Sequence, residues 1–472
     1  MKKDPLYIGI ARALEQQISR EVLKAGDKLP SIRTVQREYG VSMNTAVQAF
    51  FVLERKALVE SRPQSGYYVS NSFKRRLAVP STSKPAAPRQ QEQAEALIDA
   101  FFRNMNQPGL TRFSLGVPDD ALLPIAKLNK GLVQAMRTLP GSGTGYEDLQ
   151  GNLRLRRQIA RWSFTWGSTL TEDDLVTTAG AINALSYSLM ALTKPGDTLA
   201  VESPVYFGIL QLARSLGLKV LELPTHPVTG LELSALKKML SRINVCLLIP
   251  NFNNPLGSCM PEDHKKELVA MLAGNGIPLI EDDMYGDVYF GDSRPRPCKA
   301  FDETGSVLWC GSVSKTLAPG YRVGWVAPGR YRDQILRLKQ LHAISTTTLT
   351  QEVIAGFLEN GRYEHHLRNM RRILHTNSLH FSRAIADHFP EGTRVSRPQG
   401  GFVLWTELPA AIDTAALYQQ ALLQKISIAP GRMFTLQDQF NHCMRLSYGQ
   451  QWSTDIDNKL KVLGKIAKGL LR

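Results

Sequence analysis

The sequence predicts a multidomain protein in which a small N-terminal winged helix-turn-helix precedes a larger α/β domain with a mostly parallel sheet. Its 472 residues exceed what one ordinary hydrophobic core accommodates. Short helical patterns open the chain, and beyond residue 95 apolar runs of strand length alternate with helical segments. We therefore expect domains at residues 1–70 and 96–472, joined by a linker at residues 71–95.

Three helices and a hairpin are predicted in the first seventy residues. The first helix carries one apolar stripe, formed by Ile10, Leu14 and Ile18. Ser31 is placed to cap a second helix, "IRTVQREY", which Gly40 ends, and Ser42 is placed to cap a third, "MNTAVQAFFVLERKA". "LVESRPQSGYYVS" then indicates two short strands around a Gly-containing turn. This order is that of a helix-turn-helix with a wing.

The linker and the second domain differ sharply in composition. Residues 71–95 are rich in Ser, Pro, Ala and Gln without an apolar period, which favours a partly extended linker. Beyond it the apolar runs are "DLVTTAG", "TLAVESP", "NVCLLIP", "IPLIEDD" and "SVLWCGS". Strands alternating with helices predict a mostly parallel sheet covered on both faces, with chemistry at the carboxyl ends of the strands.

Composition limits the class of protein. Hydrophobic residues make up 43% and charged residues 21%, as in soluble globular proteins. No apolar run approaches the ~20 residues of a membrane span, and the N-terminus lacks the apolar stretch of a secretory signal, so we expect a cytoplasmic protein without membrane contact. The five cysteines are scattered without a C-x-x-C pair, which indicates reduced packing residues and no metal site.

Positive charge is concentrated at the N-terminus. The formal net charge is +15, and residues 1–76 hold 14 Lys and Arg against 7 Asp and Glu. Clustered positive charge neutralises phosphates and releases counterions, which favours nucleic acid as a partner. Anionic metabolites are an alternative that charge alone leaves open.

Several strands end in residues suited to holding an anionic ring. Gly180 forms a strand-to-helix turn whose N–H groups can bind a phosphate. Tyr206 can stack on a flat ring, and Asn254, before a proline, can bond a phenolate oxygen. Each residue alone is more often part of an ordinary turn or of the core.

Two further strand ends are more informative. "LIEDDMYGDVYF" brings Asp282 to the end of an apolar strand with Tyr285 three residues later, and a buried carboxylate needs a positive partner such as a pyridinium nitrogen. "GSVSKTLAPGYR" places Lys315 among serines and before Arg322. A lysine forms Schiff bases when burial or neighbouring positive charge lowers its pKa, and Ser312 and Arg322 are suited to binding a phosphate ester.

In this order the signals resemble the fold type I pyridoxal 5'-phosphate (PLP) aminotransferases of class I, from about residue 110 to the C-terminus. The resemblance implies a large domain and a small domain. It makes Lys315 the catalytic Schiff-base (aldimine) residue and Arg445, in "CMRLSYG", the clamp for a substrate carboxylate. The other implied cofactor and substrate contacts are Asp282, Tyr285, Asn254, Tyr206, Gly180, Ala181, Ser312, Arg322, Gly116 and, from the other subunit, Tyr146. The phosphate turn, Ala-Gly-Ala, lacks the Ser or Thr that many members have.

Residues 5–70 resemble the winged helix of the GntR family. By that resemblance Arg33 approaches the DNA backbone or a base edge, the start of the recognition helix enters the major groove, and the wing lies along the adjacent groove. The implied recognition-helix and wing contacts are Ser42, Asn44, Thr45, Arg62, Ser65 and Gly66. Met43 stands where the family often has an arginine.

A GntR winged helix joined to an aminotransferase-like domain is the layout of the MocR/GabR-type transcriptional regulators, and the chain looks closest to the YdcR-type members. The resemblance implies a head-to-tail homodimer, with each DNA-binding domain over the partner's large domain, that presents two recognition helices to paired half-sites of double-stranded DNA.

Three functions remain open from the sequence. The first is a regulator that binds PLP through a lysine aldimine and senses an amino acid, an amine or PLP itself. The second is an active aminotransferase with an accessory DNA-binding domain, since the polar groups from Asn254 to Arg445 are retained. The third, a scaffold with a dead cofactor pocket, is disfavoured because Lys315 and Asp282 are present.

Overall fold

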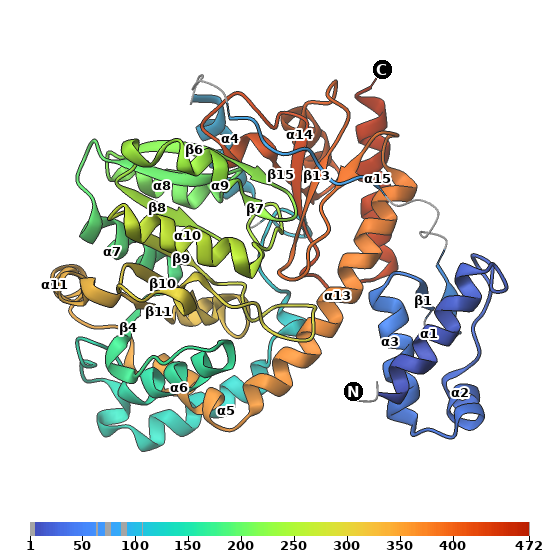
Figure 1. Ribbon diagram of the computed structural model, residues 1–472, viewed down its shortest axis with the longest axis horizontal. Helices are drawn as coiled ribbons and strands as arrows, with labels where there is room; N and C mark the ends of the chain where they lie inside the picture. The colour runs from blue at the N-terminus through green and yellow to red at the C-terminus, as the bar shows by residue number, and fades with distance from the viewer. Residues whose placement is uncertain (1–4, 63–64, 71–76, 86–91, 106, 472) are drawn as a thin grey trace.

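A computed structural model describes residues 5–62, 65–70, 77–85, 92–105 and 107–471. The predicted linker segments 71–76 and 86–91 lie outside the described residues. The N-terminal domain is a three-helix unit with a two-stranded antiparallel wing (Figure 1). Its elements are α1 (Leu6–Ser19), α2 (Ile32–Tyr39), α3 (Met43–Arg55), β1 (Val59–Arg62) and β2 (Gly66–Val69).

The predicted helix ends of this domain are confirmed. Ser31 Oγ accepts from Thr34 N at 3.1 Å, and Ser42 Oγ accepts from Thr45 N at 3.1 Å, so each serine satisfies a free N–H of the first turn. Gly40 ends α2 with φ 61°, which a residue with a side chain rarely adopts. The apolar stripe predicted for α1 is buried in the domain's own core.

The large domain is built on an eight-stranded sheet in the order β4-β11-β10-β9-β8-β5-β6-β7. All five predicted strands are present, and the carboxyl ends of β4, β5, β8, β9 and β10 share one edge because β11 runs antiparallel to both β10 and β4. The strands are β4 (Val176–Thr178), β5 (Thr198–Ser203), β6 (Lys219–His226), β7 (Gly230–Leu231), β8 (Val245–Leu248), β9 (Leu279–Asp282), β10 (Val307–Ser312) and β11 (Gly324–Ala327).

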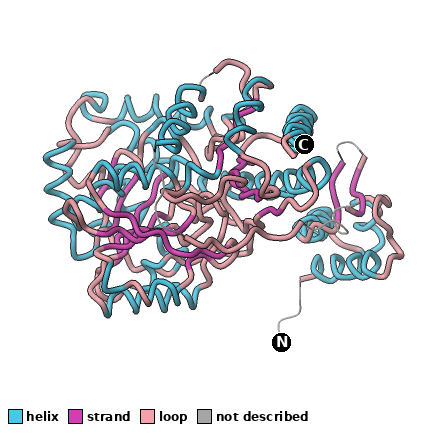
Figure 2. The backbone as a smooth tube through the Cα atoms, turned by 90° about the horizontal axis from the view of Figure 1, so that it is seen from above, coloured by secondary structure: helices cyan, strands magenta, loops and turns pink. Residues whose placement is uncertain are grey.

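Helices cover both faces of this sheet, with the strands through the middle (Figure 2). Separate apolar clusters form on its two sides, which explains why the strands read as near-continuous apolar runs. The helices of the large domain are α5 (Ile125–Thr138), α6 (Leu153–Ser163), α7 (Ala181–Leu192), α8 (Phe207–Ser215), α9 (Leu233–Lys237), α10 (Glu262–Gly274), α11 (Arg332–His342) and α12 (Thr348–Glu359).

The small domain packs helices against a four-stranded antiparallel sheet, with a two-stranded parallel pair beside it. Its strands are β12 (Arg394–Val395), β13 (Val403–Glu407), β15 (Ala429–Pro430) and β16 (Cys443–Ser447), and the pair is β3 (Thr111–Arg112) with β14 (Ile426–Ser427). Its helices are α13 (Arg362–His388), α14 (Thr414–Leu423) and α15 (Thr454–Gly469). Figure 1 shows α13 running from beside α5 to α3 of the N-terminal domain.

The described part of the linker, residues 77–85, is an extended strap fixed to both larger domains. Ser81 N donates to Glu407 Oε2 at 2.7 Å on the small domain, while Ser83 Oγ accepts from Thr225 N at 2.8 Å on the large domain. Helix α4 (Glu92–Asn104) follows and begins four residues before the predicted start of the second domain. In the described part of the chain, no helix combines the length and apolarity needed to cross a membrane.

Candidate functional site

A cavity of about 260 Å³ lies at the sheet edge where the parallel strands end. Nine residues that the sequence singled out line it, although they come from segments more than 300 residues apart. They are Gly116, Ala181, Tyr206, Asn254, Asp282, Tyr285, Lys315, Arg322 and Arg445. The carboxyl ends of parallel strands lie at one edge of the sheet. Motifs that follow different strands are therefore brought together in one site, although they are separate in the sequence.

Lys315 follows β10 and is half-buried. Its Nζ donates to Gly116 O at 2.6 Å. Loss of hydration, reinforced by the positive charge of Arg445, lowers the pKa of Lys315 to about 8, against an opposing effect of Asp282. Roughly a tenth of this amine is therefore unprotonated at pH 7, far more than for an ordinary lysine, and the unprotonated amine is the form that attacks a carbonyl carbon.

Asp282 ends β9 and is only 1% exposed. It accepts from Met284 N at 3.2 Å, and none of the described residues forms an ion pair with it. Burial raises its pKa to about 7. A buried carboxylate without a cation is costly, and the protonated nitrogen of a pyridine ring would supply the missing positive charge.

Arg322 and the turn at Gly180 form a cradle at the N-terminus of α7. Gly180 has φ 89°, and a Cβ there would overlap the Arg322 guanidinium. That guanidinium donates to Ala179 O at 3.0 Å and to Pro319 O at 3.1 Å. Because the first N–H groups of a helix lack intrahelical partners, this end of α7 together with Arg322 can hold a phosphate.

The two serines before Lys315 have different positions. Ser312 Oγ donates to Val323 O at 2.9 Å and accepts from Ser314 N at 3.0 Å, so it fixes the turn below the cavity. Ser314 lines the cavity, and its Oγ lies 3.3 Å from Arg322 Nη1. Sequence reasoning selected Ser312 and missed Ser314, because the spacing S-x-S-K does not show which hydroxyl faces the cavity.

Arg445, on β16, is a buried cation with unused hydrogen-bonding capacity. Its Nη1 donates to Asn254 Oδ1 at 2.8 Å and its Nη2 donates to Ser114 O. Its Nε is buried without a partner among the described residues, and no acidic side chain among them pairs with it. Burial lowers its pKa. These properties suit an incoming carboxylate.

The three tyrosines singled out from the sequence lie in different surroundings. Tyr285 OH accepts from Asn254 Nδ2 at 3.3 Å, which places both groups together at the cavity. Tyr206 precedes α8 and lines the cavity, and burial raises its pKa. Tyr146 is 84% exposed and does not line the cavity of its own chain.

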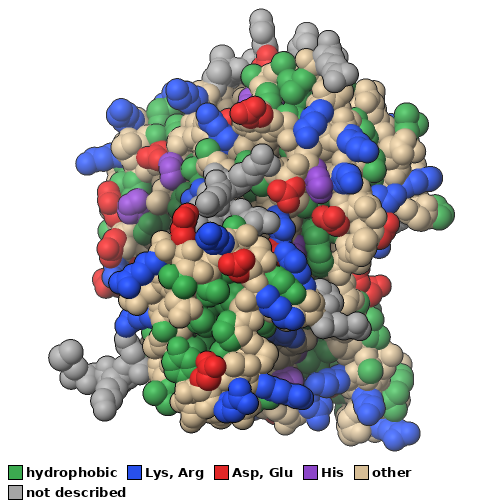
Figure 3. Space-filling model, turned by 90° about the vertical axis from the view of Figure 1, so that its right-hand side faces the viewer, with side chains coloured by type: hydrophobic (Ala, Val, Ile, Leu, Met, Phe, Trp, Pro, Cys, Tyr) green, Lys and Arg blue, Asp and Glu red, His purple; other side chains and the backbone are tan. Residues whose placement is uncertain are grey.

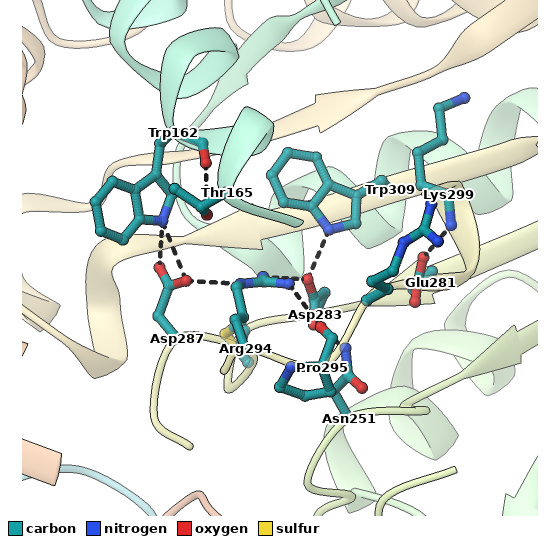
Figure 4. Close-up of polar contacts among 12 residues, drawn as sticks. Trp162, Thr165, Asn251, Glu281, Asp283, Asp287, Arg294, Pro295, Lys299 and Trp309 are labelled. Carbon is teal, nitrogen blue, oxygen red and sulfur yellow. Dashed lines mark hydrogen bonds and ion pairs between the residues drawn. The ribbon is translucent and has the colours of Figure 1, made fainter. Parts of the chain in front are cut away.

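A network of polar contacts joins the carboxylate next to Asp282 to residues of other elements (Figure 4). Asp283, next to Asp282, pairs with Arg294 Nη2 at 2.5 Å and accepts from Trp309 Nε1 at 2.8 Å. Arg294 Nε pairs with Asp287 Oδ1 at 2.7 Å. Sequence reasoning did not find this network, since Asp283 is one of three consecutive carboxylates and the pattern does not show which of them pairs with Arg294, 11 residues away.

The network reaches the neighbour of Lys315 through helix α13. Tyr363 OH donates to Asp287 Oδ2 at 2.9 Å and lies 3.0 Å from Thr316 Oγ1, and His366 Nε2 lies 2.6 Å from Thr316 O. The residues flanking Asp282 and Lys315 are thus held by one continuous set of buried polar contacts.

The residues singled out for DNA lie on the N-terminal domain. Arg33 and Asn44 are exposed. Ser42 and Thr45 have their hydroxyls 2.8 Å apart at the cap of α3, so both are engaged in holding the start of the recognition helix. Figure 3 shows the side of the molecule that carries this domain, with Lys and Arg side chains along its lower edge.

The wing presents one arginine in a fixed orientation. The Arg62 guanidinium carbon lies 4.1 Å from the centroid of Tyr68, and Arg62 pairs with Glu60 at 2.9 Å. Ser65 Oγ lies 2.7 Å from Tyr68 OH, and Gly66 has φ 104° at the start of β2. The wing therefore displays Arg62, Ser65 and Gly66 on one short hairpin.

Comparison with known proteins agrees with both parts of the chain. Residues 110–458 match the family model of class I and II aminotransferases, and residues 6–69 match that of bacterial regulatory proteins of the gntR family. YjiR and YdcR, described as uncharacterized HTH-type transcriptional regulators of Escherichia coli (strain K12), are each 36% identical to this chain. They cover 97% and 99% of it, over 98% and 99% of their own lengths.

A solved structure of LysN, an α-aminoadipate aminotransferase from Thermus thermophilus complexed with N-(5'-phosphopyridoxyl)-L-leucine, superposes with a TM-score of 0.74 at 27% identity, covering 80% of this chain and 97% of that one. Both family matches follow the order of the two parts along the chain. The chain belongs to the class I and II aminotransferase family, and with its N-terminal gntR-type domain it is a DNA-binding transcription regulator of the MocR type.

Proposed function

We propose that this regulator binds PLP covalently through Lys315 and senses an amino acid or another amine at the same cavity. The observation that carries the proposal is the pair of buried, unpaired charges, Asp282 and Arg445, on the same cavity as a lysine whose pKa is about 8. A pyridine nitrogen and a carboxylate are the two groups that would neutralise them.

The residues singled out from the sequence have separate roles in this proposal. When bound, PLP supplies a ring that withdraws electrons from the substrate Cα. Asp282 keeps the ring nitrogen protonated, and Lys315 moves a proton near Cα. Asn254 and Tyr285 bond the ring oxygen, Tyr206 stacks on the ring, and Arg445 binds the ligand carboxylate beside Gly116. The phosphate is held by Gly180, Ala181, Ser312, Arg322 and, from its position in the cavity, Ser314.

We also propose a head-to-tail homodimer that acts on paired half-sites of DNA in the cytoplasm. The exposed Tyr146 supports this arrangement, because an aromatic side chain that is 84% exposed in one chain is available to reach a partner's phosphate. We keep the domain limits 1–70, 71–95 and 96–472 as part of the proposal, with α4 crossing the second boundary.

The strap provides a route from the cavity to the DNA-binding domain. It is hydrogen-bonded to Glu407 on the small domain and to Thr225 on the large domain, so a relative movement of these domains changes the path of the chain that carries the winged helix. A ligand that favours one domain arrangement would therefore bias the position of the DNA-binding domain.

The test is visible absorption of the purified protein with added PLP. Lys315→Ala should abolish the band of the lysine-bound cofactor. Lys339→Met is the matched control, since Lys339 is buried and also has a pKa lowered to about 8 but does not line the cavity. An unchanged spectrum in Lys315→Ala, or equal loss in both variants, contradicts the proposal.

DNA binding is tested separately. Arg33→Ala should weaken binding to sheared genomic DNA. It should also reduce the slope of the logarithm of the binding constant against the logarithm of the salt concentration by about one, while the cofactor band stays intact. Arg137→Ala, an exposed arginine on α5, is the control that should change neither.

An active aminotransferase is the second candidate, favoured by the retention of Lys315, Asp282 and Arg445 in one cavity. Sustained release of keto acid from added amino acids would establish it. A spectral change without keto acid indicates a sensor.

A further inference from the structure

Helix α4 gives the cavity an apolar wall. Phe101, Phe102 and, just after the helix, Met105 line the cavity. Phe207, at the start of α8, extends the wall, with ring centroids 5.8 Å from Phe101 and 6.0 Å from Phe102. Phe102 remains 47% exposed, so its ring has apolar surface that a ligand can still cover.

This wall begins beside the carboxylate-binding arginine. The Arg445 guanidinium carbon lies 5.0 Å from the centroid of Phe434, and Phe434 lies 5.8 Å from Phe207. Because Arg445 and the wall line one cavity of about 260 Å³, a ligand that places its carboxylate on Arg445 has the wall within reach of its side chain. The same cavity residues that fix the α-carboxylate and the amine thus leave the side chain to contact α4.

The proposed function already gives every charged side chain of the cavity a binding partner. Among the described residues that line it, the charged ones are Asp282, Lys315, Arg322 and Arg445. The proposed function assigns three of them to the cofactor and Arg445 to the α-carboxylate. A second carboxylate or an ammonium group on the ligand would thus meet an apolar surface without a counter-charge, which is unfavourable.

We propose that the effector is an α-amino acid with an uncharged, apolar side chain of the size of norleucine or phenylalanine, bound against Phe101, Phe102 and Met105. This inference rests on the proposed function, because it places the ligand's amine and carboxylate at Lys315 and Arg445. The inference adds the chemical class of the ligand's side chain, which Lys315 and Arg445 do not determine.

Binding against this wall also acts on the helix that follows the strap along the chain. Helix α4 follows the strap along the chain, and it is held to α8 by the contact of Phe101 with Phe207 and by an ion pair between Glu95 and Arg214. Covering Phe102 stabilises the docked helix, so backbone amides of α4 exchange hydrogen more slowly when the ligand is bound.

The first test is calorimetric titration of the full-length, PLP-loaded protein with L-norleucine, L-glutamate, L-lysine and L-alanine. Norleucine should bind at least about tenfold more tightly than each of the others, because its methylene groups are buried and no charge is desolvated. Equal or tighter binding of glutamate or lysine overturns the inference.

The second test removes the wall. Phe102→Ala should weaken norleucine binding about five- to tenfold, leave alanine binding unchanged and abolish the slower hydrogen exchange in α4. Phe102→Leu should retain most of the affinity. Phe164→Ala, at a phenylalanine that is 79% exposed and away from the cavity, is the control and should leave every affinity unchanged.

The outcomes separate the two proposals. If PLP gives no visible band with the wild-type protein, the proposed function fails. If the band is present and shifts with amino acids but Phe102→Ala leaves the ratio of norleucine to alanine affinity unchanged, only the wall assignment is wrong.

Discussion

The two halves of helix α13 are held in different ways. Its N-terminal half enters a buried polar network through Tyr363 and His366, both bonded to Thr316 beside Lys315. Its C-terminal half meets the winged helix through an ion pair of Arg383 with Glu60 and an edge contact of His375 with Phe51 at 6.4 Å. A cavity of about 330 Å³ remains in that second contact.

The difference indicates which region is rigid and which can move at low cost. Arg294 is 5% exposed and pairs with two aspartates, whereas Arg55 of the winged helix is 29% exposed and pairs with Asp292, which is 94% exposed. Breaking a buried pair leaves a desolvated charge, while an exposed pair is replaced by water. The contacts of α13 beside Lys315 are therefore more costly to break than its contacts with the DNA-binding domain, which is the arrangement that the proposed switch requires.

The largest expected effect comes from Arg294→Leu. It leaves Asp283 and Asp287 buried without their cation, and we expect a loss of about 3–5 kcal/mol in the free energy of unfolding, measured in urea. Arg55→Leu removes the exposed pair and should cost less than about 1 kcal/mol. Similar losses in the two variants would show that the two regions do not differ as described.

Asp282→Asn should change the pH dependence of stability in the cofactor-free protein. The folded pKa of Asp282, about 7, exceeds the ordinary value of 3.8, so its stabilising contribution is full below pH ~4 and is lost as pH rises through 7. Asparagine has no proton to lose. At pH 8 the variant should therefore be more stable than wild type by roughly 2–4 kcal/mol, and near pH 4 the two should be similar. If the free energies of unfolding of variant and wild type, measured in urea, differ by the same amount at pH 4 and pH 8, the assigned burial of Asp282 is wrong.

Tyr363→Phe tests the link between α13 and the neighbour of Lys315. It removes the hydroxyl that bonds Asp287 and Thr316, and we expect a loss of about 1–2 kcal/mol, since Asp287 keeps its bonds to Trp162 and Arg294. PLP affinity should fall with it. An unchanged affinity would mean that the network stabilises the fold without orienting Lys315.

The smallest effect is expected at the wing. Tyr68→Leu removes the ring below Arg62, and we expect DNA binding to weaken about two- to fivefold, in line with an exposed cation–π contact. Stability and the cofactor spectrum should stay unchanged. A loss of the cofactor band would imply that the wing and the cavity are coupled more strongly than their contacts indicate.

Much of the fold and site could be predicted because it depends on local signals. The caps at Ser31 and Ser42 and the left-handed Gly40 follow from the needs of helix ends, and the strands follow from buried apolar runs. The nine predicted residues that line the cavity follow strands or turns whose order along the chain matches a family. The gntR and aminotransferase matches confirm the two family resemblances that the sequence indicated.

Other features were decided only by tertiary structure. The turn after β10 decides that Ser314 lines the cavity, and the polar network joins Asp287 to Trp162 and Tyr363, which lie 125 and 76 residues away along the chain. The apolar wall of α4 depends on where an amphipathic helix docks, and an amphipathic pattern specifies a buried face without specifying its partner. The sequence by itself thus determined the two kinds of domain and most of the polar residues of the cavity. Only packing decided what surrounds them, because burial and charge pairing depend on contacts that are distant along the chain.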